Sequence, residues 1–152
     1  MIELLEGTSW ASAADLSCGN GAVLDAVDAP ADKKYYGDLA PGRAFTGPLE
    51  DTILKLPAVD LFILGETLEH LDDPGLALSR IANRSWWLLM STPLDCWDDS
   101  NEEHYWAWDR EGVEGLLAGA AAGAGPSVSE FAEVDTRTYG EPYRYGIWLV
   151  RW

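Results

Sequence analysis

A glycine-rich turn close to the start of the sequence constrains this chain most. Small and apolar residues lead to Asp15, Gly19 and Gly21 alternate with polar residues, and an apolar helical pattern begins at Ala22. The two glycines allow the backbone to bend sharply and to approach a ligand closely. Amide groups at the start of the following helix would face the turn. The pattern predicts a nucleotide-binding crevice at the carboxyl end of a first strand over 13–16.

The residues of the turn narrow the class of nucleotide. No third glycine completes the dinucleotide fingerprint, and no lysine is present as a P-loop requires. The carboxylate of Asp15 would repel a pyrophosphate but suits a ligand with a positive centre. The run resembles motif I of the class I S-adenosylmethionine-dependent methyltransferases, with Ser17 at the place of that family's first glycine. The resemblance implies that the cofactor contacts Asp15, Ser17, Cys18, Gly19, Asn20 and Gly21.

The second predicted strand, over 35–38, ends in an acidic residue. Asp38 follows Gly19 by 19 residues, and in nucleotide-binding α/β folds an acidic residue at about this distance accepts hydrogen bonds from ribose hydroxyls. We therefore expect Asp38, with Leu39 beside it, to bind the ribose. Prolines and glycines leave no room for a long helix before a short third strand over 44–46. The resemblance then places Leu49 and Glu50 at the adenine ring.

A fourth strand, over 59–64, is continuously apolar except for one aspartate, as expected for a strand buried on both faces. The segment from Gly65 to Pro74 resembles the motif that follows this strand in small-molecule methyltransferases, which implies that Gly65 and Glu66 lie beside the sulfonium. Asp73 is expected to cap a helix that begins at Pro74.

The second half of the chain continues the alternation of strands and helices. A fifth strand is predicted over 84–91, followed by a helix that begins after Asp109 and ends at 123–126. The chain then closes with a predicted hairpin of strands over 129–138 and 145–152. The aromatic loop 94–108 is too long for a simple connection, so we expect it to build the substrate site.

The whole of 1–152 is predicted to be a single S-adenosylmethionine-binding methyltransferase domain with an α/β fold. The resemblance implies a three-layer, Rossmann-like, mostly parallel sheet of about seven strands, the last antiparallel. The helices are reduced in number, because none fits between the second and third strands. A face covered by so few helices would need another surface against it, which predicts a homodimer or a partner protein.

The net charge of the chain limits the classes of molecule that it can bind. The chain has 26 acidic and 10 basic residues, a net charge of −16, and no cluster of lysine or arginine. Nucleic acid would be repelled, so we expect a small-molecule acceptor. No apolar run reaches the ~20 residues of a membrane span, and no signal peptide is recognisable. The sequence therefore predicts a cytoplasmic protein with no membrane contact.

The resemblance implies methyl transfer from S-adenosyl-L-methionine, which leaves S-adenosyl-L-homocysteine. The acceptor and its reacting atom are not identified by the sequence. His104 and His70 are the only imidazoles that could act as a base, and Glu66 would lie close to the reacting centre. These three residues are the predicted catalytic groups, and no metal is expected in this reaction.

Three alternatives remain open. Glu66, Glu69, His70 and His104 resemble the divalent-metal site of the methyltransferases that modify the 2′-hydroxyl at small-RNA 3′ ends, and a helical turn would place Glu66 and His70 on one face. The trimmed domain could instead bind cofactor without turnover. A third possibility is an acidic mimic of nucleic acid, which would bind no cofactor.

Overall fold

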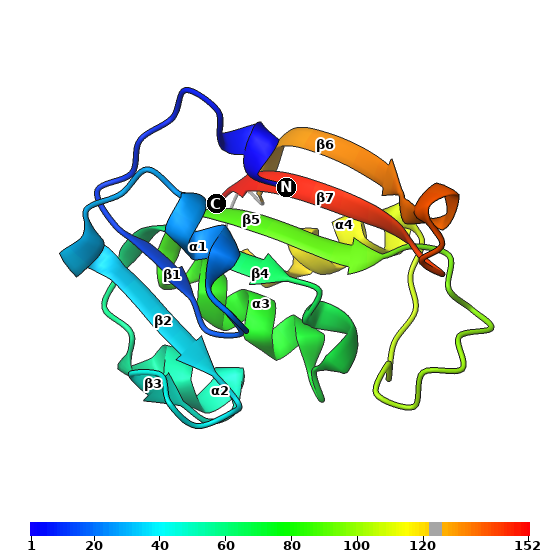
Figure 1. Ribbon diagram of the computed structural model, residues 1–152, viewed down its shortest axis with the longest axis horizontal. Helices are drawn as coiled ribbons and strands as arrows, with labels where there is room; N and C mark the ends of the chain where they lie inside the picture. The colour runs from blue at the N-terminus through cyan, green and yellow to red at the C-terminus, as the bar shows by residue number, and fades with distance from the viewer. Residues whose placement is uncertain (122–125) are drawn as a thin grey trace.

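A seven-stranded sheet organises the molecule. The computed structural model describes residues 1–121 and 126–152, and its strands lie in the order β3-β2-β1-β4-β5-β7-β6 (Figure 1). The strands are β1 Ala13–Asp15, β2 Lys34–Asp38, β3 Phe45–Thr46, β4 Val59–Gly65, β5 Ser85–Pro93, β6 Ser127–Asp135 and β7 Arg144–Arg151. The first five strands are parallel, and β7 runs antiparallel to both β5 and β6. The predicted fold class is confirmed.

The helices are short, and few of them exceed two turns. They are α1 Ala22–Ala26, α2 Leu49–Thr52, α3 Pro74–Ala82 and α4 Arg110–Ala120, with 3₁₀ turns η1 Ile2–Leu5, η2 Ala31–Lys33, η3 Ile53–Lys55, η4 Leu68–His70 and η5 Thr136–Tyr139. No helix lies between β2 and β3, as predicted. Among the described residues, no helix is long and apolar enough to cross a membrane.

Strand β4 shows how the two faces of the sheet are buried. Phe62 and Leu64 face a core that α3 and α4 complete, whereas Leu61 and Ile63 face a second core on the opposite side. Side chains alternate between faces along a strand, so a strand covered on both faces is apolar throughout. This arrangement gives three layers.

The face covered by fewer helices is nevertheless closed. Leu5 from η1 and Leu24 from α1 pack there, and Leu61, Ile63 and Leu149 of the sheet are buried beneath them. A second chain is not needed to remove these side chains from water. An uncovered sheet face was the reason to expect a homodimer, and the structure does not show such a face. The homodimer stays a prediction.

Several predicted boundaries were wrong by one to three residues. The strand expected over 129–138 ends at Asp135, because the Asp135 carboxylate accepts a hydrogen bond from the Arg137 amide and starts η5. The strand expected over 84–91 continues to Pro93, because Ser91–Pro93 pairs with β7. The end expected for the last helix, at 123–126, falls mostly outside the described residues, and α4 ends before it at Ala120.

Candidate active site

A crevice of about 460 Å³ opens at the carboxyl ends of β1 and β4. The chain crosses from one side of β1 to the other here, since β2 pairs with one edge of β1 and β4 with the other. Ligands of open α/β sheets bind at such switch points. The lining residues include most of the predicted turn and some residues from the C-terminal hairpin: Asp15, Ser17, Cys18, Gly19, Asn20, Val23, Ile63, Gly65, Glu66, Ser91, Val134, Thr136, Tyr145 and Ile147, together with Met1.

The turn after β1 has the geometry that its glycines predict. Gly19 and Gly21 have φ of 51° and 88°, in the region that side-chain-bearing residues rarely adopt. The Cys18 amide donates to the Gly37 carbonyl at 2.9 Å, and the Gly21 amide donates to the Cys18 carbonyl at 2.7 Å. The turn is therefore tied both to itself and to β2.

Asp15 is a buried carboxylate at the bottom of the crevice. Its side chain is 5% exposed, and it accepts hydrogen bonds from the backbone amide and the hydroxyl of Ser17. Burial raises the pKa of Asp15 to about 6, although the Ser17 hydrogen bonds act in the opposite direction. A cationic ligand in the crevice would favour the charged form of this carboxylate.

Asp38 lies at the carboxyl end of β2, where it was expected, but it does not line the crevice. One carboxylate oxygen accepts from the Gly19 amide at 2.8 Å, and the other accepts from the Ala40 amide at 2.9 Å. Lone pairs remain on both oxygens for a ribose hydroxyl. Leu39 beside it is 73% exposed. The ribose role of this pair stays a prediction.

The residues predicted for adenine lie further from the turn. Leu49 is the first residue of α2, and its side chain is buried in the core. The Glu50 carbonyl accepts a hydrogen bond from Arg80. Neither residue lines the crevice. Sequence reasoning missed Arg43, whose guanidinium donates to the Gly19 carbonyl at 2.7 Å and braces the turn from outside.

Glu66 and Tyr145 both line the crevice. Glu66 has a φ of 47°, an uncommon value for a residue with a side chain. Burial and the neighbouring Glu66 carboxylate raise the pKa of Tyr145 above its ordinary value. The sequence of β7 predicted only a strand, so it gave no sign that Tyr145 would reach the site.

Glu69, His70 and His104 form a compact cluster beyond Glu66. One ligand atom from each lies within 4.8 Å of the other two. Glu69 is only 2% exposed, and its carboxylate accepts a hydrogen bond from the Thr92 hydroxyl at 3.0 Å. Burial raises the pKa of Glu69, while that hydrogen bond opposes the change. The loop 94–108 thus brings a distant histidine beside the segment after β4.

Both histidines are oriented by acceptors at Nδ1. His70 Nδ1 lies 2.8 Å from the Glu103 carbonyl, and His104 Nδ1 lies 2.6 Å from Asp99 Oδ2. A carbonyl oxygen can only accept, so Nδ1 of His70 must carry the proton, and the Asp99 carboxylate favours the same arrangement at His104. In neutral imidazoles this leaves the Nε2 lone pairs free to bind a proton or a metal ion.

The helical turn expected to unite Glu66 with His70 does not form. The 3₁₀ turn covers only Leu68–His70, and Glu66 lies before it with a positive, non-helical φ. Within the described residues, Glu66 is absent from the cluster of potential metal ligands. Of the four residues in the alternative metal site, the structure brings together Glu69, His70 and His104.

Comparison with known proteins agrees with the architecture. No family profile and no curated protein matches the chain. Among solved structures, the small RNA methyltransferase HEN1 aligns over 99% of this chain with a TM-score of 0.72 and 18% identity. The chain spans only 24% of that HEN1 chain.

Two smaller enzymes align over most of their own length. The 1,6-didemethyltoxoflavin-N1-methyltransferase of Burkholderia thailandensis, solved with S-adenosylhomocysteine, has a TM-score of 0.70 and 16% identity over 99% of this chain and 74% of its own. The N-methyltransferase NodS of Bradyrhizobium japonicum has a TM-score of 0.68 and 16% identity, and the alignment covers 97% of this chain and 80% of NodS. This chain therefore has the class I S-adenosylmethionine-dependent methyltransferase fold.

Proposed function

We propose that this protein is a methyltransferase that uses S-adenosyl-L-methionine and acts on a small-molecule acceptor. The observation that carries the proposal is the 460 Å³ crevice, because it joins the glycine turn after β1 to the Glu66–Tyr145 pair. Its volume lies within the roughly 300–1,000 Å³ of small-molecule sites. A structural neighbour solved with bound 1,6-didemethyltoxoflavin and S-adenosylhomocysteine supports the same assignment.

The charges of the crevice suit this cofactor. S-adenosylmethionine supplies a methyl group on a positively charged sulfur, and its methionine end carries an ammonium group. Asp15 and Glu66 provide two carboxylates among the residues that line the crevice. The backbone of the turn can approach the ligand closely because Gly19 has no side chain. Asp38 is assigned to the ribose hydroxyls.

His104, Asp99 and Tyr143 are the residues proposed to remove a proton from the methyl acceptor or to support that step. His104 is the proposed base, with Nε2 as the atom that takes a proton from the acceptor as the methyl group is transferred. Asp99 fixes the ring through the 2.6 Å contact to Nδ1 and stabilises the charged imidazolium that results. Tyr143 in turn donates to Asp99 at 3.2 Å.

Calorimetric titration and a transfer assay together test the proposal. S-adenosylhomocysteine should bind at a single site. Gly19→Val should abolish this binding, because a β-branched side chain is strained at a φ of 51° and would occupy the open space beside the turn. Transfer of labelled methyl from S-adenosylmethionine to a small-molecule library should then reveal an acceptor. Cofactor binding without transfer would favour a binding module, and no binding at all would favour the nucleic-acid mimic.

A second candidate function follows from the Glu69, His70 and His104 cluster. One buried carboxylate and two imidazoles with Nδ1 occupied are a mixed oxygen and nitrogen donor set that fits a divalent transition-metal ion such as Mn²⁺. A divalent ion held by these residues would act as a Lewis acid toward acceptor hydroxyls. Methyl transfer to the 2′-hydroxyl of an RNA end is the reaction this would serve, and the likeness to HEN1 supports it. The net charge of −16 argues against an RNA substrate.

Titration with Mn²⁺ separates the two candidates. If the cluster is a metal site, one ion should bind in the presence of S-adenosylhomocysteine, and His70→Ala should abolish that binding. Asp28→Asn serves as the control, since Asp28 is an exposed carboxylate far from the cluster in sequence. The absence of Mn²⁺ binding would leave His104 as a base and remove the second candidate.

A further inference from the structure

A second cavity lies beside the histidine cluster and plays no part in the cofactor assignment. It has a volume of about 350 Å³ and lies between the start of the loop after β5 and the connection from η5 to β7. Figure 1 shows both segments at the same end of the sheet. The walls are formed by Leu94, Asp95, Cys96, Trp97, Asp98, Asp99, Ser100, Arg137, Pro142, Tyr143 and Arg144.

Two of these residues connect the cavity to the proposed reaction. Asp99 lines the cavity and also holds His104, and Tyr143 lines it and donates to Asp99. The Tyr143 ring lies 5.9 Å from the ring of Tyr145, which lines the cofactor crevice. The cavity and the cofactor crevice are thus lined by neighbouring tyrosines, Tyr143 in one and Tyr145 in the other.

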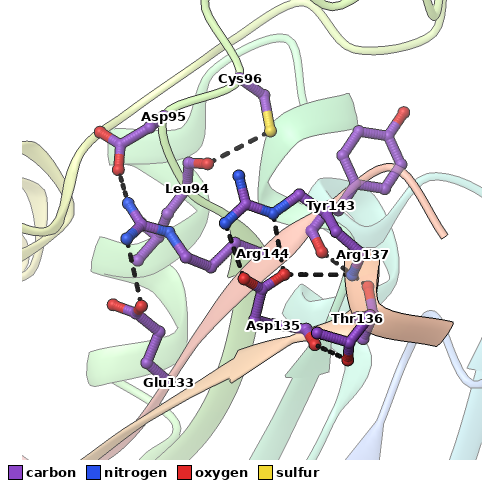
Figure 2. Close-up of polar contacts among 10 residues, drawn as sticks. Leu94, Asp95, Cys96, Glu133, Asp135, Thr136, Arg137, Tyr143 and Arg144 are labelled. Carbon is purple, nitrogen blue, oxygen red and sulfur yellow. Dashed lines mark hydrogen bonds and ion pairs between the residues drawn. The ribbon is translucent and has the colours of Figure 1, made fainter. Parts of the chain in front are cut away.

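The two arginines of the cavity are already neutralised. Arg144 forms ion pairs with Asp95 and Glu133, and Arg137 is paired with Asp135 through two nitrogens (Figure 2). Figure 2 shows each guanidinium directed at its carboxylate partners. Guanidinium groups held in this way have little capacity left to attract an anionic ligand.

Negative charge and an aromatic surface remain for a ligand. Asp98 is exposed, and among residues 1–121 and 126–152 its carboxylate has neither a hydrogen bond nor an ion pair. Asp99 accepts hydrogen bonds from the Asn101 amide and the Tyr143 hydroxyl, which favour its charged form. Trp97 is 63% exposed on the same cavity. Carboxylates beside an indole ring attract an organic cation through charge and cation–π contact.

We propose that this cavity selects a positively charged acceptor, a small molecule with an ammonium group that sits between Asp98 and the Trp97 ring. The inference rests on the proposed function, because it names the class of acceptor for the same site. The ammonium group remains protonated in the cavity and serves only for recognition. Another part of the molecule extends past Tyr143 toward the crevice and carries the atom to be methylated.

Matched pairs of probes test this charge preference. Tyramine and tryptamine are titrated beside 4-hydroxyphenylacetate and indole-3-acetate, which keep the rings but exchange the ammonium group for a carboxylate. We expect the amines to bind at least about tenfold more tightly than the carboxylates, with a preference that declines in high salt. Asp98→Asn and Trp97→Ala should each lower amine affinity severalfold. Asp28→Asn, an identical change of charge at a site outside the cavity, should leave it unchanged.

S-adenosylhomocysteine titrated into the same samples separates the two proposals. The Asp98 and Trp97 variants should retain wild-type affinity for it, which also shows that they fold. Equal affinity for amines and carboxylates, or no binding of any probe while S-adenosylhomocysteine binds, overturns the acceptor inference and leaves the methyltransferase proposal standing. Failure of S-adenosylhomocysteine to bind overturns both, because the inference depends on the cofactor site.

Discussion

Replacing Asp15 with asparagine should stabilise the fold while it weakens cofactor binding. The pKa of Asp15 is raised from 3.8 to about 6 by burial. The folded state therefore binds this proton more tightly than the unfolded state. The Asp15 carboxyl therefore makes the fold more stable as the pH falls from about 6 to about 4. Above pH 7 the side chain is charged in both states, and its destabilising effect is complete. This difference in pKa corresponds to roughly 3 kcal/mol of folding stability that is lost when Asp15 is charged.

Asparagine retains an acceptor for Ser17 but cannot be charged. Because its hydrogen bonds are weaker than those of a carboxylate, we expect a gain of about 1–3 kcal/mol in the free energy of unfolding at pH 7.5. The gain should shrink at pH 4.5, where the wild-type side chain is mostly protonated. Urea unfolding at the two pH values measures both quantities.

The control for this experiment is Asp28→Asn, which removes an exposed carboxylate and should change stability by less than about 0.5 kcal/mol. In parallel, Asp15→Asn should lower the affinity for S-adenosylmethionine, because a carboxylate that faces the cationic ligand is lost. A variant that is less stable than the wild type at pH 7.5, or equally stabilised at both pH values, would refute the account of Asp15 as a strained buried charge.

The remaining predictions concern packing and orientation. Gly146→Ala should cost at least about 2 kcal/mol, because a Cβ there would run into the Trp148 ring and lie 2.9 Å from a Leu94 methyl group. In contrast, Gly115→Ala on α4 meets no atom within 4 Å and should add about 0.5–1 kcal/mol, so equal thermal unfolding of the two variants would contradict the packing described. Asp99→Ala should mix the two neutral tautomers of His104 in ¹⁵N spectra with S-adenosylhomocysteine affinity intact, and an unchanged tautomer would show that Asp99 does not position the ring.

The sequence predicted the fold where local patterns were strong. The alternating glycines, the apolar run of β4 and the Asp73 cap of α3 each belong to one segment, and the structure contains each of them. The alternation of strands and helices along the chain predicted a mostly parallel sheet. The carboxyl ends of parallel strands meet at one edge of a sheet, so the turn after β1 and the segment after β4 could be expected to lie together.

The acceptor side could not be predicted in the same way. Tyr145 reaches the site because of the register between β7 and its neighbours, and Tyr143 directly precedes that strand. No local pattern encodes this register. Asp99 was missed because its role depends on how the loop folds back onto β7. The supposed helix from Glu66 failed because the chain adopts a positive φ at a residue that is not glycine, for which the sequence carries no signal.

A structure determined with S-adenosylhomocysteine tests the central claim most directly. The account predicts that the ligand occupies the crevice at the carboxyl ends of β1 and β4, with its methionine end near Asp15 and Glu66 and its ribose at Asp38. A crevice that stays empty at saturating ligand, or a ligand bound elsewhere with Asp38 still bonded only to Gly19 and Ala40, would contradict it.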